Sequence, residues 1–285
     1  MKKNFNISLI LATRNRPIQA INFLNSAFIK CAFPDNIEVI MFVDDDDNNY
    51  DDFMSPFLET RILRGPRKNL PFHLRACAEA SKSKILFFVN DDSVVETFGW
   101  DSKIIDVHNS VEDSIYLCYP NDCFKGKELA VFPVLSKFCY NTFELLPTIY
   151  KGAFSDTHIH EIFHLLSALG HNRLFYQDSI IVRHNHYRTT GEKPDKTYTD
   201  RARFGDDLTF LKGVAGRFRM ANMIKDFIED KKNIIPKNDI NMNLGTIGSS
   251  VWFYIFIFPK NLNYRIKLIL KLSMRFFYSI ILRKH

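Results

Sequence analysis

The stretch Lys84–Trp100, which reads KILFFVNDDSVVETFGW, decides the fold of this chain. Five consecutive apolar residues, Ile85–Val89, end abruptly at Asn90, Asp91 and Asp92. An apolar run of this length bounded by polar residues is typical of a strand buried on both faces, as in a parallel sheet. Ligands of open α/β sheets bind beyond the carboxyl ends of such strands, so the two carboxylates are expected at the mouth of a site. They could hold a divalent cation with a diphosphate, and the alternative is a plain solvated turn.

Strand and helix patterns alternate along the first hundred residues. Strands are predicted over Ile7–Ala12, Ile37–Val43 and Arg61–Leu63, and helices over Ile18–Cys31, Tyr50–Leu58 and Pro71–Ala80. Pro17 suits the first position of a helix, where its missing amide is not needed. This alternation predicts βαβ units, and therefore an α/β fold with a mostly parallel central sheet flanked by helices. The strand Ile37–Val43 also ends in acidic residues, here Asp44–Asp47.

Beyond Trp100 the pattern is less regular. Helices are predicted over Asp101–His108, Asp156–Leu169 and most of Arg201–Asp230, and strands over Ser114–Tyr119, Arg173–Tyr176 and Ser179–Val182, with a strand or loop at Leu129–Val134. Ser155 suits the N-cap of the Asp156 helix, and Gly170 suits the position just after its end. The polar stretch Gly191–Asp200 is predicted to be a mobile loop.

The charges of the chain are unevenly distributed along its 285 residues, so the net charge of +6 does not describe most of it. No acidic residue follows Asp239, whereas seven basic residues do. The part before this tail holds 31 basic and 32 acidic residues, a net charge of −1. Because that part has no excess of positive charge, its composition excludes a nucleic-acid-binding protein.

The cysteines and the N-terminus indicate a cytoplasmic protein. The five cysteines are odd in number and form no CxxC pair, which favours buried thiols in a reducing compartment. Two lysines and a short apolar run resemble the beginning of a signal peptide. The run Ile7–Ala12 is interrupted by Ser8, is shorter than a signal-peptide core, and is soon followed by Arg14 and Arg16. We therefore expect it to be the first strand.

An ordered set of motifs resembles a known family. The motifs are SLILATRNRP at 8–17, IEVIMFVDDDD at 37–47, KILFFVNDDS at 84–93, GAFSDTHIHEIFHLLSALGHNRLFY at 152–176 and VRHNH at 182–186. Together they are similar to a glycosyltransferase of the A-type fold. The resemblance is strongest to the large family of inverting enzymes that use nucleotide-sugars, family 2, and to its short bacterial and phage members. It covers about Ile7 to Thr199.

The resemblance implies a nucleotide pocket formed by the residues that follow the first two strands. Thr13, Arg14 and Asn15 would line it, since a backbone turn and a cationic side chain favour a diphosphate. Asp44 and Asp45 match the family's acid that hydrogen-bonds the base or the ribose, and Asp91 is expected to contact the nucleotide as well. The alternative for the run of four aspartates is a charged turn, whose like charges repel one another.

The resemblance also implies a metal site. Asn90-Asp91-Asp92 matches the DxD motif with asparagine in place of the first aspartate, which makes Asp92 the expected ligand of Mn²⁺ or Mg²⁺. A histidine after a later strand often completes such sites, and His184 or His186 stands in a suitable place. A single histidine is more often a surface or core residue.

A general base is expected on the helix that begins near Ser155. Inverting transfer needs a base that deprotonates the acceptor hydroxyl as it attacks opposite the leaving diphosphate. Asp156 matches the acid that the family carries at the start of its acceptor-site helix. The alternative is that Asp156 only caps this helix, because aspartate suits an N-terminus.

Two other functions are compatible with the sequence. His160-Glu161-Ile162-Phe163-His164 fits HExxH, which in metalloproteases supplies two zinc ligands and a general base. Ser167 stands where the extended motif requires glycine. A degenerate transferase domain that binds nucleotide or glycan without turnover is the other alternative, and Asn90 is its main support.

The C-terminal tail predicts a contact with a membrane surface. Val251–Phe258 is apolar but far shorter than the roughly 20 residues of a spanning helix. Basic or polar residues then recur at every fourth position: Lys267, Lys271, Arg275, Ser279 and Arg283. A helix with such a basic stripe and otherwise apolar sides lies in the interface of an anionic membrane. The alternative is a helix packed on the domain with its lysines outward.

The sequence thus predicts a metal-dependent hexosyltransferase at the cytoplasmic membrane face. It would move a sugar from a nucleoside-diphosphate donor to a surface glycan or its lipid-linked precursor. Residues 1–200 would form the A-type catalytic domain, 201–245 a helical extension, and 246–285 the apolar and basic tail.

Overall fold

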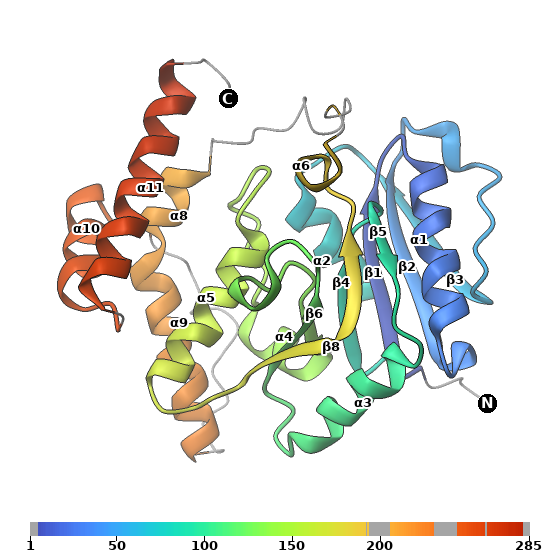
Figure 1. Cartoon of the computed structure of the whole chain (residues 1–285), viewed down its shortest axis with the longest axis horizontal. Coiled ribbons are helices and arrows are strands. Elements are labelled where there is room, and N and C mark those ends of the chain that lie inside the picture. Colours follow the sequence, from blue (N-terminus) through green and yellow to red (C-terminus); the bar gives the residue numbers. More distant parts are fainter. Residues whose placement is uncertain (1–4, 192, 194–205, 231–243, 260, 282–285) are drawn as a thin grey trace. The chain divides into compact units, whose positions relative to one another are not determined.

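The computed structural model describes residues 5–191, 193, 206–230, 244–259 and 261–281 (Figure 1). The predicted loop Gly191–Asp200 falls almost wholly outside them. The chain forms two compact units: unit 1 contains residues 1–140 and 175–200, and unit 2 contains 141–174 and 201–285. This division differs from the predicted boundary at residue 200, because the helix that carries Asp156 packs against a helix of the C-terminal part.

A curled sheet of eight strands, in the order β3-β2-β1-β4-β7-β6-β8-β5, is the centre of unit 1. The strands are β1 (Ile7–Thr13), β2 (Ile37–Asp44), β3 (Glu59–Gly65), β4 (Ile85–Val89), β5 (Ser93–Val95), β6 (Leu117–Asn121), β7 (Val134–Ser136) and β8 (Leu174–His184). The first four run parallel to one another. Strand β7 pairs antiparallel with β4 and β6, and β5 pairs antiparallel with β8. The predicted parallel sheet is therefore extended by antiparallel strands that arise later in the chain.

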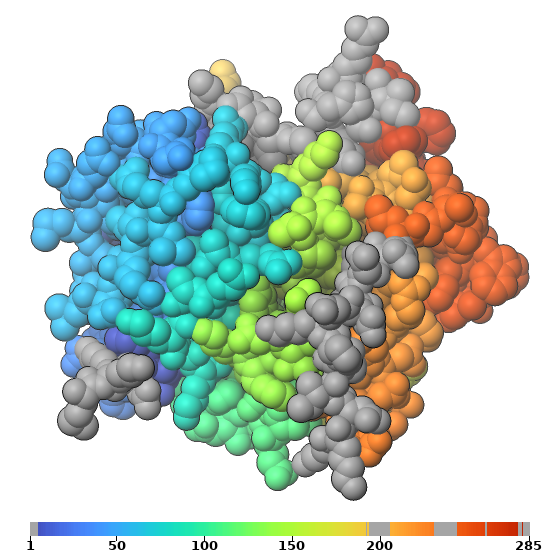
Figure 2. Space-filling view, turned by 180° about the vertical axis from the view of Figure 1, so that it is seen from behind, coloured from blue at the N-terminus to red at the C-terminus, as the bar shows by residue number. Residues whose placement is uncertain are grey.

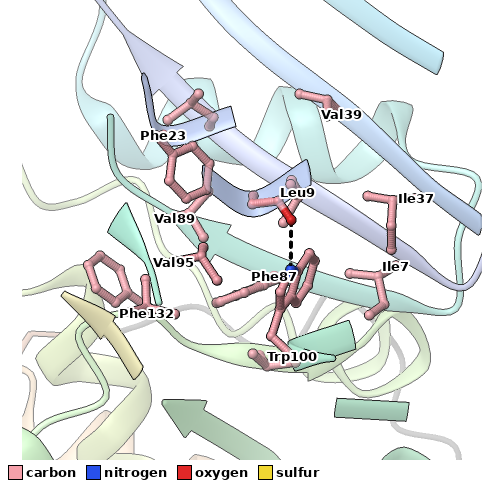
Figure 3. Close-up of a cluster of buried hydrophobic side chains, with 14 of the residues drawn as sticks. Ile7, Leu9, Phe23, Ile37, Val39, Phe87, Val89, Val95, Trp100 and Phe132 are labelled. Atoms are coloured by element: carbon pink, nitrogen blue, oxygen red, sulfur yellow. Dashed lines mark hydrogen bonds between the residues drawn. The ribbon is translucent and has the colours of Figure 1, made fainter. Parts of the chain in front are cut away.

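The core of unit 1 follows from the alternation of side chains along the buried strands. Odd-numbered residues of β1, β2 and β4, among them Leu9, Val39 and Phe87, join one cluster (Figure 3). That cluster includes the inner faces of α1 (Pro17–Lys30) and α3 (Trp100–Ser110). Trp100 closes it, with its indole Nε1 donating to the carbonyl oxygen of Ala27 at 2.9 Å. Helix α2 (Leu70–Ala80) packs against β1 and β2.

The strand register brings three polar strand ends together. Thr13 of β1 pairs with Val43 of β2, and Leu11 pairs with Val89 of β4. The loops that follow β1, β2 and β4 therefore leave the sheet at the same edge, which we call the carboxyl edge. The position expected for the nucleotide is at this edge.

Two local predictions are wrong in detail. The helix predicted over Tyr50–Leu58 is only a 3₁₀ turn, η2 (Asn48–Tyr50), because Pro56 disfavours a helical conformation in the residue before it. The two strands predicted within residues 173–182 are one continuous strand, β8.

Unit 2 is helical. Its elements include α5 (Ser155–Ala168), α8 (Asp207–Lys212), α9 (Val214–Asp230), α10 (Ile247–Phe256) and α11 (Leu262–Ile281), and α4 (Lys137–Phe143) ends in it. Helix α5 packs against α9, and both α10 and α11 contact α8. Ser155 is the first residue of α5, so it does not cap the helix as predicted. Gly170 just after the helix has a φ of 98°, as its predicted position requires.

Candidate nucleotide and metal site

Asp91 lies at the carboxyl edge of unit 1 with its side chain turned into the protein. Its Oδ2 accepts a hydrogen bond from Thr13 Oγ1 at 2.7 Å, and its Oδ1 accepts one from Arg16 Nη1 at 3.0 Å. Tyr50 OH completes the group at 2.6 Å from Thr13 Oγ1. Burial raises the pKa of Asp91 to about 6, and the Arg16 guanidinium opposes that rise. Asp91 therefore ties the end of β4 to the loop after β1.

Arg14 binds the acidic run that follows β2. Its Nη1 donates to Asp44 Oδ2 at 2.6 Å, and its two terminal nitrogens donate to the carboxylate of Asp46 at 2.5 and 2.9 Å. Asp45 is exposed, and its backbone amide donates to the carbonyl of Gly65. Since two carboxylates already bind Arg14, this residue orients the acidic run as well as adding positive charge.

His73 of α2 packs beside Asp44 at the end of β2. Its ring stacks on Phe42 with centroids 4.1 Å apart, and its Nε2 lies 3.5 Å from Asp44 Oδ1. The same nitrogen accepts the amide of Lys68 at 3.1 Å. Burial lowers the pKa of His73, so near neutral pH the ring is uncharged.

Asp47 fixes the backbone of the loop after β1. Its Oδ2 accepts the amide of Asn15 at 2.6 Å, and its Oδ1 accepts the amide of Asn49. Asn15 has a φ of 54°, a left-handed conformation that asparagine adopts more readily than most residues. The predicted pocket residues Thr13, Arg14 and Asn15 are thus each held by an aspartate.

Asp92 and His184 meet because β5 and β8 run antiparallel. Ser93 pairs with His184, which places Asp92 opposite Asn185, and the amide of Asn185 donates to the carbonyl of Asp92 at 2.8 Å. His184 Nε2 lies 3.3 Å from Asp92 Oδ1. The tight turn between β4 and β5 is closed by Ser93 Oγ, which donates to the carbonyl of Asn90 at 2.6 Å.

His184 is a buried imidazole with unused hydrogen-bonding capacity. Only 7% of its surface is exposed, and neither ring nitrogen has a hydrogen-bond partner among the described residues. Aromatic neighbours surround it: Phe132 at 5.3 Å and His186 at 5.3 Å between ring centroids. His186 differs, because its Nδ1 accepts the amide of Arg188 and caps the short helix α6 (Tyr187–Thr190).

The carboxyl edge carries more negative than positive charge. Five aspartates take part in the contacts described above: Asp44, Asp46, Asp47, Asp91 and Asp92. Arg14 and Arg16 are the arginines among them, which leaves a net charge of −3 before histidines are counted. A diphosphate would bring further negative charge. A divalent cation would offset the resulting repulsion.

The donor atoms at this edge fit a divalent cation that is shared with a ligand. Asp92 offers a carboxylate oxygen, and His184 offers a buried ring nitrogen 3.3 Å from that oxygen. Within the described residues no group of three or more histidine, cysteine or acidic side chains is arranged to hold a metal by itself. Ions such as Mg²⁺ commonly bind one or two carboxylates together with substrate phosphates, so two protein ligands are sufficient.

Asp156, the predicted base, belongs to unit 2. It is the second residue of α5, and its Oδ1 accepts the amide of Thr157 at 2.7 Å. The side chain is partly exposed. The helix N-terminus favours the anionic form that a base needs.

The HExxH motif has a structural role in unit 2. Glu161 Oε1 accepts a hydrogen bond at 2.7 Å from Arg217 Nε, and Arg217 is fully buried. Arg217 also donates to Tyr254 OH and to the carbonyl of Phe210. The Glu161 carboxylate is thus occupied by an interaction inside unit 2. The rings of His160 and His164 lie 6.0 Å apart, and no third ligand joins them in the described part of the chain, so we find no support for a zinc hydrolase.

The sequence analysis missed several residues of this site. Arg16, Asp46, Asp47, Tyr50 and His73 all contact predicted site residues. Arg16 carried a signal, since it is a second cation in the same short loop as Arg14. The contacts of Tyr50 and His73 come from segments whose positions only the fold determines.

Comparison with known proteins supports the fold. No family model matches the chain, and no curated protein matches its sequence. The mannosyltransferase PcManGT from Pyrobaculum calidifontis, solved in complex with GDP-Man and Mn²⁺, matches with a TM-score of 0.51 at 10% identity. The match covers 94% of this chain and 75% of that chain. The chain has the fold of a nucleotide-sugar glycosyltransferase. The predicted A-type α/β fold with a C-terminal helical extension is confirmed.

A second solved structure is similar over a smaller share of its length. S. aureus TarS matches with a TM-score of 0.45 at 13% identity, over 80% of this chain and 46% of that chain. At these identities the likeness concerns the fold, so the activity has to be argued from the site.

Proposed function

We propose that this protein is a metal-dependent glycosyltransferase that moves a sugar from a nucleoside-diphosphate donor to a glycan or lipid-linked acceptor. The observation that carries the proposal is the approach of the buried His184 Nε2 to within 3.3 Å of Asp92 Oδ1 at the carboxyl edge. In this fold that edge is where a ligand binds. The excess of negative charge there favours a cation–diphosphate complex over a bare anion.

The residues of unit 1 divide into donor-binding and metal-binding groups. Asp44 would accept hydrogen bonds from the base or ribose, with Arg14 holding it in position. Thr13, Arg14 and Asn15 would line the phosphates, and Asp91 would fix their loop. Asp92 and His184 would hold Mn²⁺ or Mg²⁺, with His186 beside them. When bound, the cation would neutralise the charge on the departing nucleoside diphosphate.

Asp156 would act as the general base of an inverting transfer. Its carboxylate would take the proton of the acceptor hydroxyl as that oxygen bonds to the anomeric carbon of the donor sugar. The bond from that carbon to the diphosphate oxygen breaks at the same time. The anionic form at the N-terminus of α5 suits this role.

Release of nucleoside diphosphate from a panel of nucleotide-sugars tests the proposed function. GDP-mannose is the first donor to try, because PcManGT was solved with it and Mn²⁺. We expect release with at least one donor, its loss in EDTA, and its recovery on addition of Mn²⁺. Binding without turnover of any donor would instead support the degenerate binding domain that Asn90 suggests.

We also propose that the C-terminal helices dock on an anionic lipid surface. Helix α11 buries Leu272 and turns an apolar stripe outward: Leu262, Ile266, Leu270, Met274, Phe277 and Ile281. Lys267 and Lys271 are exposed beside it and would each add about 1 kcal/mol near anionic lipid. Trp252 and Phe256 of α10 are also exposed, and Figure 2 shows these helices in orange and red.

The predicted basic stripe is wrong at one position. Arg275 turns inward and pairs with Asp207, while Arg283 lies outside the described residues. The docking proposal therefore depends on exposed apolar residues more than on a basic face. No helix in the described part of the chain is long and apolar enough to cross a bilayer.

Exchange of Leu270 and Phe277 together for serine should weaken vesicle binding about tenfold or more, because each apolar side chain contributes about 1.5–3 kcal/mol when buried. Co-sedimentation with vesicles containing phosphatidylglycerol measures the effect. Leu58→Ser is the matched control, since Leu58 is 86% exposed in unit 1. Wild-type binding by the double variant, or no binding by the wild-type chain, would contradict docking through this face.

A further inference from the structure

The helix that carries Asp156 begins in an unfavourable backbone conformation. Phe154, directly before α5, has a φ of 70° and a ψ of 2°, and its side chain makes no capping hydrogen bond. A bulky residue in the left-handed region is an outlier that persists only where its surroundings hold it. The contacts of Phe154 and of the three residues before it therefore determine where α5 begins.

Asp206 holds the backbone immediately before Phe154. Its Oδ1 accepts the amide of Lys151 at 2.9 Å, and its Oδ2 accepts the amides of Gly152 and Ala153 at 2.8 and 3.0 Å. The Asp206 side chain is 1% exposed. Three amides that converge on one buried carboxylate form strong, charge-assisted hydrogen bonds. This arrangement fixes residues 151–153, which we call the strap.

Helix α11 also contacts the region before α5, through Arg275. The Arg275 Nε lies 2.7 Å from Asp207 Oδ1, and its guanidinium carbon lies 5.2 Å from the centre of the Phe154 ring. The Phe154 ring also stacks on Phe210 of α8, with centroids 4.7 Å apart. Burial raises the pKa of Asp207 to about 6, and Arg275 opposes that rise. Arg275 is therefore the counter-charge of a buried carboxylate and a direct neighbour of Phe154.

We propose that Arg275 and Asp206 are positioning residues for Asp156, and that through Arg275 the C-terminal helix α11 controls the activity of the base. Asp206 holds the strap, Arg275 holds Phe154 and Asp207, and together they set the first turn of α5. Movement of α11, for instance when its outer face meets a lipid surface, changes the position of Asp156. The inference rests on the proposed function, because it needs Asp156 to be the base.

Arg275→Met is the variant that tests this link. It keeps much of the length of the side chain and removes the guanidinium that pairs with Asp207 and faces the Phe154 ring. We expect kcat to fall about 10- to 100-fold, since small misplacements of a reacting group have effects of this size, while nucleoside diphosphate binding stays unchanged. Arg219→Met is the matched control, because Arg219 is exposed on α9 of the same unit.

A double variant separates positioning from general destabilisation. If Arg275 acts through Asp156, then Arg275→Met should cause no further loss of kcat in an Asp156→Asn background. A role limited to folding would lower activity equally in both backgrounds and would overturn the proposal. Should Arg275→Met fail to fold, Arg275→Lys decides the question. Lysine keeps the charge near Asp207 but lacks the planar group over Phe154, so a reduced kcat is expected and an unchanged one contradicts the link.

Hydrogen exchange supplies a readout that does not require activity. The amides of Lys151, Gly152 and Ala153 should exchange faster in Arg275→Met than in the wild-type chain, and at wild-type rates in Arg219→Met. Unchanged exchange in Arg275→Met would overturn the coupling even if the enzyme is active. An inactive wild-type chain would refute the proposed function, and exchange would still report whether α11 holds the strap.

Discussion

Asp92→Ala should remove nearly all sugar transfer while leaving the protein folded. The expected loss in kcat/KM is about 10²- to 10³-fold, because a cation that stabilises the leaving diphosphate contributes several kcal/mol to the transition state. Asp92 is close to His184, and its replacement leaves the Thr13–Asp91–Arg16 contacts in place. Nucleoside diphosphate release at saturating Mn²⁺ measures the effect.

Asp52→Ala is the control for this prediction. Asp52 is an exposed aspartate in the loop after β2, so its removal changes the net charge of unit 1 by the same amount. We expect its activity to equal that of the wild-type chain. Equal activity of Asp92→Ala and the wild-type chain, or equal losses in both variants, would show that Asp92 holds no catalytic cation.

Asp156→Asn should lower kcat about 10²- to 10⁴-fold, the range that a general base contributes. Asparagine keeps an oxygen that can accept the Thr157 amide and loses only the interaction of the charge with the helix dipole, about 0.3–1 kcal/mol, so thermal stability should change little. The variant therefore distinguishes the two roles of Asp156. If Asp156 only capped the helix, kcat would be unchanged. Binding of the nucleoside diphosphate should also be retained.

Asp226→Asn is the matched control for the base. Asp226 is exposed on α9, and its closest ion pair, with Lys225, is 4.0 Å long. Wild-type kcat is expected for it. A wild-type kcat in Asp156→Asn would contradict the assignment of the base and would leave the capping role of Asp156 as the explanation.

The parallel half of the fold could be predicted from the sequence because its signals are local. The run Ile85–Val89 is apolar without interruption, and the structure makes it a strand with those same bounds. Pro17 marks the first residue of α1. The antiparallel strands β5 and β7 have three residues each, too few for a periodic pattern, so their pairing could not be predicted.

The candidate site was predictable where a residue directly follows a strand. Thr13, Asp91 and Asp92 stand at strand ends, and a parallel sheet brings such positions to one edge. The contact of Asp92 with His184 depends on the antiparallel register of β5 and β8, which the sequence does not encode in a readable way. The side chain of Asp91 points into the protein and contacts Arg16. The spacing of the two residues in the sequence does not reveal this contact.

The C-terminal helix shows how spacing can mislead. Lys267, Lys271 and Arg275 recur at intervals of four residues, and a helix turns by 400° over that interval, so each successive side chain is rotated by 40°. The first two remain exposed, whereas Arg275 has rotated far enough to meet Asp207 of α8. The regular spacing of basic residues therefore includes Arg275, which pairs with Asp207 inside unit 2 and is less exposed than the two lysines.

Calorimetric titration with a nucleoside diphosphate tests the central claim most directly. The wild-type chain should bind GDP or another nucleoside diphosphate in Mn²⁺ and lose most of that affinity in EDTA. Asp92→Ala should show the same weak binding in both conditions. Tight binding that is indifferent to Mn²⁺, or a Mn²⁺ dependence that persists in Asp92→Ala, would contradict a cation site at Asp92 and His184.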